Sequence, residues 1–149
     1  SKRWPAAYYA EIAKFYVNEG WNVLCIGSKN DEDIGIEIDS LNNLRSNESF
    51  INLIGKTSLQ DAIDILAFTE KVVTNDSGLM HIAAAVKTPL VALYGPSSPE
   101  YTPPLISKKK ILRKTQGYEK VRYGSNEKGY HQSLLDIKPE EVLDALEAL

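Results

Sequence analysis

The chain has 149 residues, of which 43% are hydrophobic and 25% are charged, and its formal net charge is −3. This length and composition are typical of one globular domain with a core of its own. They exclude a low-complexity chain, and no apolar run approaches the roughly 20 residues that a membrane-spanning helix needs.

The first half of the chain is predicted to alternate between helix and strand. Apolar residues at helical spacing predict a helix over 5–20 that ends at a glycine. The apolar run 21–27 predicts a buried strand. A helix over 31–44, whose pattern is weakened by Gly35 and by its Asn- and Ser-rich end, and a short strand over 50–54 follow.

The second half continues this alternation. Thr57 and Gln60 have the spacing of a capping box, and an apolar stripe that begins at Leu59 predicts a helix. Residues 117–132 look irregular. The remaining predicted elements are a strand, a helix, two strands and a last helix, over 71–74, 76–86, 89–94, 111–112 and from Pro139 onward.

Apolar strands that alternate with helices of crossover length predict an α/β fold, namely a Rossmann-like parallel sheet with helices on both faces. Doubly wound units normally open with a strand, whereas this chain opens with a helix. We therefore expect that a piece of the fold is missing upstream of residue 1. The only cysteine, Cys25, lies in an apolar run, which excludes a disulfide within the chain and suits a cytoplasmic protein.

Four turn-forming residues, 75–78, separate the predicted strand 71–74 from the helix that follows. Parallel sheets bind ligands beyond the carboxyl ends of their strands, and the first turn of a helix offers free N–H groups and a partly positive dipole end. Asp76 or Asn75 can cap this turn, and Gly78 lets a ligand approach the backbone. These residues fit both a phosphate cradle and an ordinary helix cap.

His81 follows Ser77 by four residues, so the two share one helix face. His81 could lie beside a ligand, or it could be a hydrogen-bonded histidine in the core, and the sequence leaves both alternatives open. The loop 93–99, which follows the next strand, is expected to lie beside the first turn. The stripe expected to face the core consists of Leu79, Ile82, Ala83 and Val86.

Two further candidates belong to the same edge of the predicted sheet. Lys2 precedes the first helix and could pair with a phosphate, or it could be an ordinary terminal lysine. Asp31 or Glu32 follows the strand 21–27, where an acid can accept hydrogen bonds from ribose hydroxyls or simply begin a helix.

Positive charge is concentrated in the stretch 108–128. It holds eight Lys and Arg residues against two Glu, a net charge of +6, so the rest of the chain carries −9. The stretch suits an anionic partner or a solvated edge strand. Nucleic acid is not expected, because the remainder is acidic and no basic motif is interleaved with aromatic residues. Two distant histidines without a cysteine cluster give no indication of a metal site.

Three blocks carry a resemblance to a known family: SKRWP at 1–5, VTNDSGLMHIAAAVKTPLVALYGPSSPEYTPP at 73–104, and KGYHQSLLDI at 128–137. With them the chain resembles the C-terminal half of the glycosyltransferases of family 9. The fold of that family is GT-B, with two Rossmann-like domains that face a cleft. The resemblance implies that residues 1–149 are the C-terminal nucleotide-sugar (donor) binding domain, without its first strand and without its partner, the N-terminal acceptor domain.

The resemblance also implies a reaction: the inverting transfer of L-glycero-D-manno-heptose from ADP-heptose to the inner-core heptose of lipopolysaccharide, with ADP as the leaving group. No metal or other cofactor is implied. The expected place of action is the cytoplasm. The charge of the basic stretch 108–128, and not the resemblance, further suggests peripheral contact with phosphorylated lipopolysaccharide at the cytoplasmic face of the inner membrane. The catalytic base is expected in the N-terminal domain, so this chain alone is not expected to transfer sugar. The alternative is a non-catalytic nucleotide-binding or regulatory module of the same fold.

Carried over position by position, the resemblance implies a set of donor-binding residues. Lys2 would offset the charge on the leaving phosphate. Asp31 would bind the ribose, with Glu32 as the alternative. The full set is Lys2, Asp31, Asp76, Ser77, Gly78, Leu79 and His81.

Overall fold

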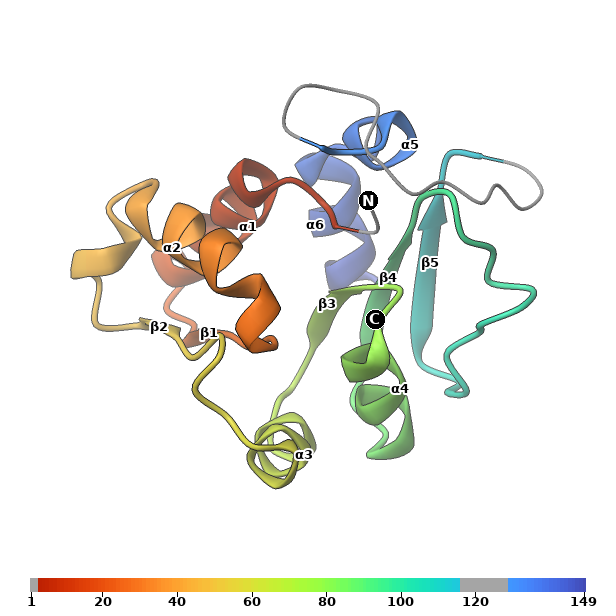
Figure 1. The fold of residues 1–149 in the computed structure, drawn as a ribbon, viewed down its shortest axis with the longest axis horizontal. Coiled ribbons are helices and arrows are strands. Elements are labelled where there is room, and N and C mark those ends of the chain that lie inside the picture. The colour runs from red at the N-terminus through yellow and green to blue at the C-terminus, as the bar shows by residue number, and fades with distance from the viewer. Residues whose placement is uncertain (1–2, 116–128) are drawn as a thin grey trace. The chain divides into compact units, whose positions relative to one another are not determined.

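The computed structural model describes residues 3–115 and 129–149 (Figure 1). The chain separates into two compact units. Residues 6–62 form the N-terminal unit, and residues 63–149 together with residues 1–5 form the C-terminal unit.

The N-terminal unit is built on a small parallel sheet in which Val23 of β1 lies opposite Phe50 of β2. Small buried residues of α1, among them Ala10 and Ala13, let the helix pack closely on a core that includes Ile38 of α2. The elements of this unit are α1 (Ala6–Asn18), β1 (Val23–Cys25), the 3-10 turn η1 (Lys29–Asp31), α2 (Glu32–Ser40), the 3-10 turn η2 (Leu44–Ser46), β2 (Phe50–Asn52) and the start of α3 (Leu59–Ala67).

The strand predicted over 21–27 is shorter and less buried than expected. Leu24 is 42% exposed, and its register partner Ile51 is 48% exposed. Only the opposite face of this strand, with Val23 and Cys25, packs against the core. The prediction of full burial was therefore wrong for one face of β1, because an apolar run does not tell whether one face of a strand or both are covered.

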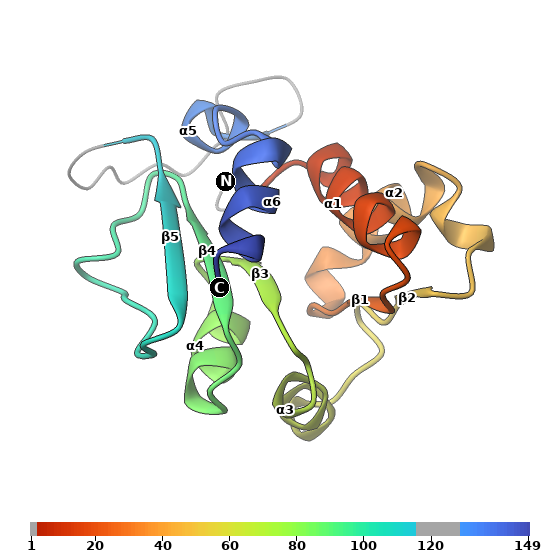
Figure 2. The same ribbon diagram turned by 180° about the vertical axis from the view of Figure 1, so that it is seen from behind.

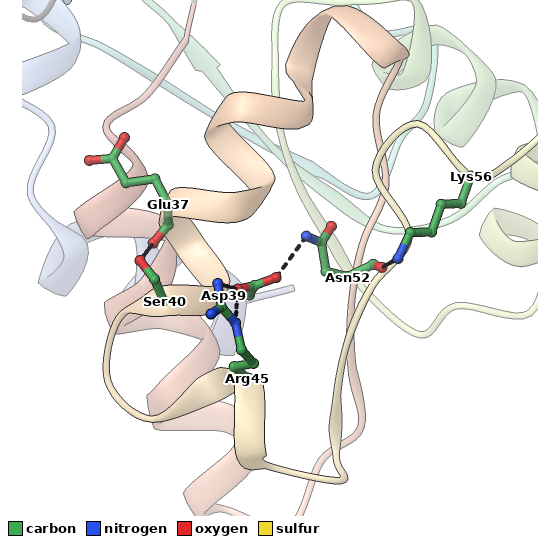
Figure 3. A network of polar contacts seen from close by, with 6 residues as sticks. All are labelled: Glu37, Asp39, Ser40, Arg45, Asn52 and Lys56. Carbon is green, nitrogen blue, oxygen red and sulfur yellow. Dashed lines mark hydrogen bonds and ion pairs between the residues drawn. The ribbon is translucent and has the colours of Figure 1, made fainter.

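The second helix, predicted over 31–44, is α2, which runs unbroken through Gly35 and ends at Ser40. Gly35 is buried where α2 approaches β2 closely. A Cβ at Gly35 would lie 3.0 Å from the side-chain amide atoms of Asn52. That amide donates to Oδ2 of Asp39 over 3.1 Å, and Arg45 binds Oδ1 of the same carboxylate at 2.8 Å (Figure 3). These contacts join the end of α2 to β2. They give Asn52, Asp39 and Arg45 a structural role in holding the helix against the strand.

The C-terminal unit contains a parallel sheet of three strands in the order β3-β4-β5. All five residues of β4 are buried. Helix α4 packs on β3 and β4, and α6 packs on β4 and β5. Figures 1 and 2 show these two helices on opposite sides of the sheet. The elements are β3 (Val72–Asn75), α4 (Gly78–Ala85), β4 (Leu90–Tyr94), β5 (Lys109–Arg113), α5 (Gln132–Leu135) and α6 (Pro139–Glu147).

The predicted α/β fold with parallel strands and helices on both faces is confirmed in this unit. The glycine stop of the first helix is also confirmed, since Gly20 has a φ of +89°. The irregular segment predicted over 117–132 falls mostly on residues 116–128, which lie outside the described residues, and its last residue begins α5.

The start of α3 differs from the prediction by one residue. The capping box is formed by Ser58 and Asp61, not by Thr57 and Gln60. The Ser58 N–H donates to Oδ2 of Asp61 over 3.0 Å, and the Asp61 N–H donates to Oγ of Ser58 over 3.1 Å. Both pairs have the required spacing, so spacing alone could not choose between them. Leu59 then falls in the first turn and is 68% exposed, so the buried side of the predicted stripe begins at Ala62 and not at Leu59.

Candidate functional site

The turn between β3 and α4 brings together most of the predicted site. The helix begins at Gly78, with Ser77 as its N-cap residue, and the Ser77 side chain makes no capping hydrogen bond. The predicted start at Asp76 and the predicted capping positions, Asp76 or Asn75, were therefore wrong. Asn75 belongs to β3, and Asp76 lies one residue before the cap. The first backbone N–H groups of α4 accordingly receive no acceptor from their N-cap side chain.

Asn75 instead holds the N-terminal segment of the chain. Its Oδ1 accepts a hydrogen bond from the Trp4 N–H over 3.0 Å. The indole of Trp4 is fully buried and donates from Nε1 to the Ile137 carbonyl over 2.9 Å. The segment that carries Lys2 is thus anchored at the residue before Asp76. Lys2 itself lies outside the described residues.

Asp76 is buried beside the loop that follows β4. Its side chain is only 6% exposed, and its Oδ2 lies 3.3 Å from the hydroxyl of Thr102. Thr102 also donates its backbone N–H to the Ser98 carbonyl over 3.2 Å. The expectation that the two strand-end loops lie side by side is therefore confirmed. Burial raises the pKa of Tyr94, at the end of β4, to about 12, and the negative charge of Asp76 adds to that rise.

Gly78 leaves open space at the positive end of α4. A Cβ at this position would meet no atom within 4 Å. The partial positive charge of the helix dipole and the free N–H groups of the first turn favour an anion at this place. The Ser77 side chain does not cap the helix, and the space at Gly78 is open. Both observations are compatible with a phosphate cradle, which stays a prediction.

His81 and Ser77 are both exposed, whereas Leu79 is half-buried. The core side of α4 consists of Met80, Ala83 and Ala84, so the predicted stripe was wrong by about one residue of helix rotation. The interpretation of His81 as a hydrogen-bonded core histidine was wrong as well, because its ring is exposed. Within residues 3–115 and 129–149 the ring has no hydrogen bond or ion pair.

Asp31 lies in the N-terminal unit, in the turn after β1. Its Oδ2 accepts from the Ser28 N–H over 3.0 Å and from the Ser28 hydroxyl over 3.1 Å. The neighbouring Glu32 is exposed and covers Gly55, where a Cβ would lie 2.4 Å from its Oε1. Asp31 is thus held in one orientation by its own turn, whereas the Glu32 side chain lies on the surface.

Comparison with known proteins identifies the family. The family model described as glycosyltransferase family 9 (heptosyltransferase) matches residues 1–131. The chain belongs to glycosyltransferase family 9. It is 50% identical over 149 residues to lipopolysaccharide heptosyltransferase 2 of Salmonella typhimurium, and equally to that of Escherichia coli. All of this chain but only 43% of each relative is covered, so the family 9 chain spans less than half of their length.

Solved structures agree with this membership. The structure of E. coli ADP-heptose lipopolysaccharide heptosyltransferase II matches with a TM-score of 0.88 and 47% sequence identity, over 99% of this chain and 41% of that one. The predicted resemblance to family 9, and within it to heptosyltransferase II, is confirmed. The Rossmann-like fold as part of a GT-B enzyme is confirmed by the same match.

Several residues of the site were missed by sequence reasoning. Thr102 is 26 residues from Asp76, and Trp4 is 133 residues from Ile137, so no local pattern marks either contact. Ser97 is 7% exposed, and its hydroxyl oxygen has no hydrogen-bond partner among the described residues. The only signal was its place in the loop after a predicted strand.

The described part of this family 9 chain holds no group of three His, Cys, Asp or Glu side chains arranged as metal ligands. None of the described helices is both long and apolar enough to cross a lipid bilayer.

Proposed function

We propose that residues 1–149 are the C-terminal, donor-binding domain of a heptosyltransferase that transfers L-glycero-D-manno-heptose from ADP-heptose to the inner-core heptose of lipopolysaccharide, with inversion. The observation that carries this proposal is the open space at Gly78, on the positive end of α4 and beside the buried Asp76. The 50% identity to lipopolysaccharide heptosyltransferase 2 supports the choice of donor and acceptor.

Each predicted site residue has a role in this proposal. The diphosphate binds at the N–H groups of 77–79, where the dipole of α4 favours its charge. Asp76 accepts hydrogen bonds from the sugar, and His81, exposed on the same helix, lies beside the donor. Asp31 receives the ribose hydroxyls. Lys2 pairs with the phosphate, which suits the anchoring of Trp4 at Asn75.

The chemistry proposed for this domain is stabilisation of a leaving group. In an inverting transfer the acceptor hydroxyl attacks the anomeric carbon, its proton passes to a base, and the bond to ADP breaks. Negative charge then grows on the diphosphate. Fixed N–H donors and a lysine stabilise that charge without reorganisation. We assign no catalytic base to this chain, and we place the base and the acceptor site in the part of the enzyme that this chain does not span.

We further propose that the enzyme works in the cytoplasm, at the cytoplasmic face of the inner membrane, where its acceptor is anchored. The exposed Lys108 and Lys110, on and beside the edge strand β5, are suited to peripheral contact with phosphorylated lipid. Nucleic acid is not among the partners that we propose.

A chimera tests the proposal. The chain replaces the matching 149 residues of E. coli lipopolysaccharide heptosyltransferase 2, to which it is 50% identical. We expect the purified chimera to transfer heptose from ADP-heptose to a heptose-bearing inner-core acceptor. The variant Asp76→Asn should lose most of this activity, because the carboxylate is the acceptor for the sugar.

The matched control is Thr88→Val. Thr88 precedes the first residue of β4, at the end of the strand opposite to the candidate site. The residue is 2% exposed, and the variant removes its hydroxyl, which donates to the Leu66 carbonyl. This variant should keep its activity. A folded chimera that binds ADP-heptose but transfers no sugar would contradict the proposal and favour a non-catalytic binding module of the same fold.

A further inference from the structure

The loop after β4 places a hydroxyl on the buried carboxylate of Asp76. Oγ1 of Thr102 lies 3.3 Å from Oδ2 of Asp76. A carboxylate that is only 6% exposed needs hydrogen-bond donors, because burying an unpaired charge is costly. We propose that Thr102 is a positioning residue, whose hydroxyl holds the Asp76 carboxylate in the orientation that receives the sugar of the donor. This inference rests on the proposed function.

The hydroxyl proton of Thr102 has two acceptors within reach. They are Oδ2 of Asp76 and the Ser98 carbonyl, each at 3.3 Å. The Ser98 carbonyl already accepts the N–H of Tyr101 over 3.1 Å and the N–H of Thr102 over 3.2 Å. A carbonyl oxygen has two lone pairs, so both are in use. The proton therefore goes to the carboxylate, which is also the stronger acceptor because it is charged.

Thr102 is itself held by a residue of β4. The hydroxyl of Tyr94, a residue with no exposed surface, donates a short hydrogen bond to the Thr102 carbonyl. Because the pKa of Tyr94 is raised to about 12 by burial and by the charge of Asp76, the phenol remains a donor at every physiological pH. Tyr94, Thr102 and Asp76 thus form a chain of contacts from the centre of the sheet to the turn.

The chemistry of Asp76 determines which part of the donor the contacts of Tyr94, Thr102 and Asp76 help to bind. A carboxylate has no proton to give to a phosphate and is repelled by its charge. Its partners on a nucleotide sugar are hydroxyl groups or the amino group of the base. In the proposed donor pose, with the diphosphate at the N-terminus of α4, Asp76 serves the hydroxyls of the transferred heptose. The effect of Thr102 should therefore appear with ADP-heptose and be absent with ADP.

The experiment is calorimetric titration of the chain with ADP-heptose and with ADP. Thr102→Val should raise the dissociation constant for ADP-heptose about ten-fold, at the low end of what a hydrogen bond to a charged group is worth, and leave that for ADP within about two-fold. Thr102→Ser keeps the hydroxyl and should restore ADP-heptose binding. Tyr94→Phe leaves Thr102 in place but releases its carbonyl, and should give a smaller loss of about three-fold, again with ADP-heptose alone.

Thr88→Val is the control for general destabilisation. It removes a hydroxyl that is more deeply buried than that of Thr102 and remote from the loop, and it should leave the ratio of the two dissociation constants unchanged. Equal weakening of both ligands by Thr102→Val, or no change in either, would overturn the positioning role while leaving the proposed function in place. A folded wild-type chain that binds neither ligand would overturn the proposed function and this role with it.

Discussion

Replacing Gly78 by alanine should separate ligand binding from stability. Gly78 is the first residue of α4, and a Cβ there meets no atom within 4 Å, so the fold accepts the methyl group. A glycine-to-alanine change at a compatible backbone position stabilises by about 0.4–1 kcal/mol, mainly because the unfolded chain loses freedom. In a chain of this size, this corresponds to a rise in melting temperature of about 1–4 °C.

Binding should change in the opposite direction. The new methyl group fills the space through which a phosphate would approach the backbone N–H groups. Losing one hydrogen bond to a charged group costs about 1.5–3 kcal/mol, which corresponds to an affinity about 10- to 100-fold weaker. The assay is calorimetric titration with ADP-heptose, paired with thermal unfolding of the same samples.

Gly95→Ala is the contrasting variant. A Cβ at Gly95 would lie 2.7 Å from Cγ of Leu134, so this change should destabilise the fold by about 1–3 kcal/mol. If Gly78→Ala instead binds ADP-heptose as tightly as the wild type, no phosphate passes that glycine, and the argument from open space fails. A joint fall of stability and affinity in Gly78→Ala would equally refute it.

Three further outcomes are expected. Trp4→Phe leaves the buried Ile137 carbonyl without its donor and should lower the free energy of unfolding by about 1–3 kcal/mol, seen as a lower urea midpoint at unchanged slope. The hydrogen bond from Lys114 lowers the pKa of the Glu141 carboxyl in the folded chain. The ionised Glu141 therefore stabilises the fold fully above the pKa that it has in the unfolded chain, and this stabilisation is lost as the pH falls through the pKa in the folded chain. Lys114→Met should accordingly cost up to about 1 kcal/mol at pH 7 and nothing at pH 2, by thermal unfolding; an equal cost at both pH values would contradict this. Burial, with the charge of Asp39 as a second cause, raises the pKa of Cys25 to about 12, so at pH 8 its thiol should react with a disulfide reagent on the order of a thousand-fold more slowly than in the unfolded chain; rapid labelling of the folded chain would refute it.

The sequence was sufficient for the features that depend on local patterns. Alternating apolar runs predicted the parallel strands and helices, and a polar turn after an apolar strand predicted the candidate site at 75–78. The cap at Ser58 was missed because Thr57 has an equally valid partner at the same spacing, and only packing decides the register.

Contacts between distant segments were beyond the reach of local patterns. Asn75 looked like a capping residue because its type favours helix starts, but a tertiary donor, the Trp4 N–H, takes its side chain. The contact of Thr102 with Asp76 depends on how a loop folds back over β4, which no periodicity encodes. The ligand-binding roles of all the predicted site residues, Asp31 and those of the turn 75–78 included, stay predictions.

Calorimetric titration of the purified chain with ADP-heptose, compared with a nucleotide sugar of a different base such as UDP-glucose, tests the central claim most directly. We expect saturable one-to-one binding of ADP-heptose, no detectable binding of UDP-glucose, and a loss of about ten-fold or more in affinity in Asp76→Asn, since the amide replaces the charged acceptor of the buried site. A folded chain that does not bind ADP-heptose, or that binds it equally well as Asp76→Asn, would contradict the assignment of a donor site to the turn between β3 and α4.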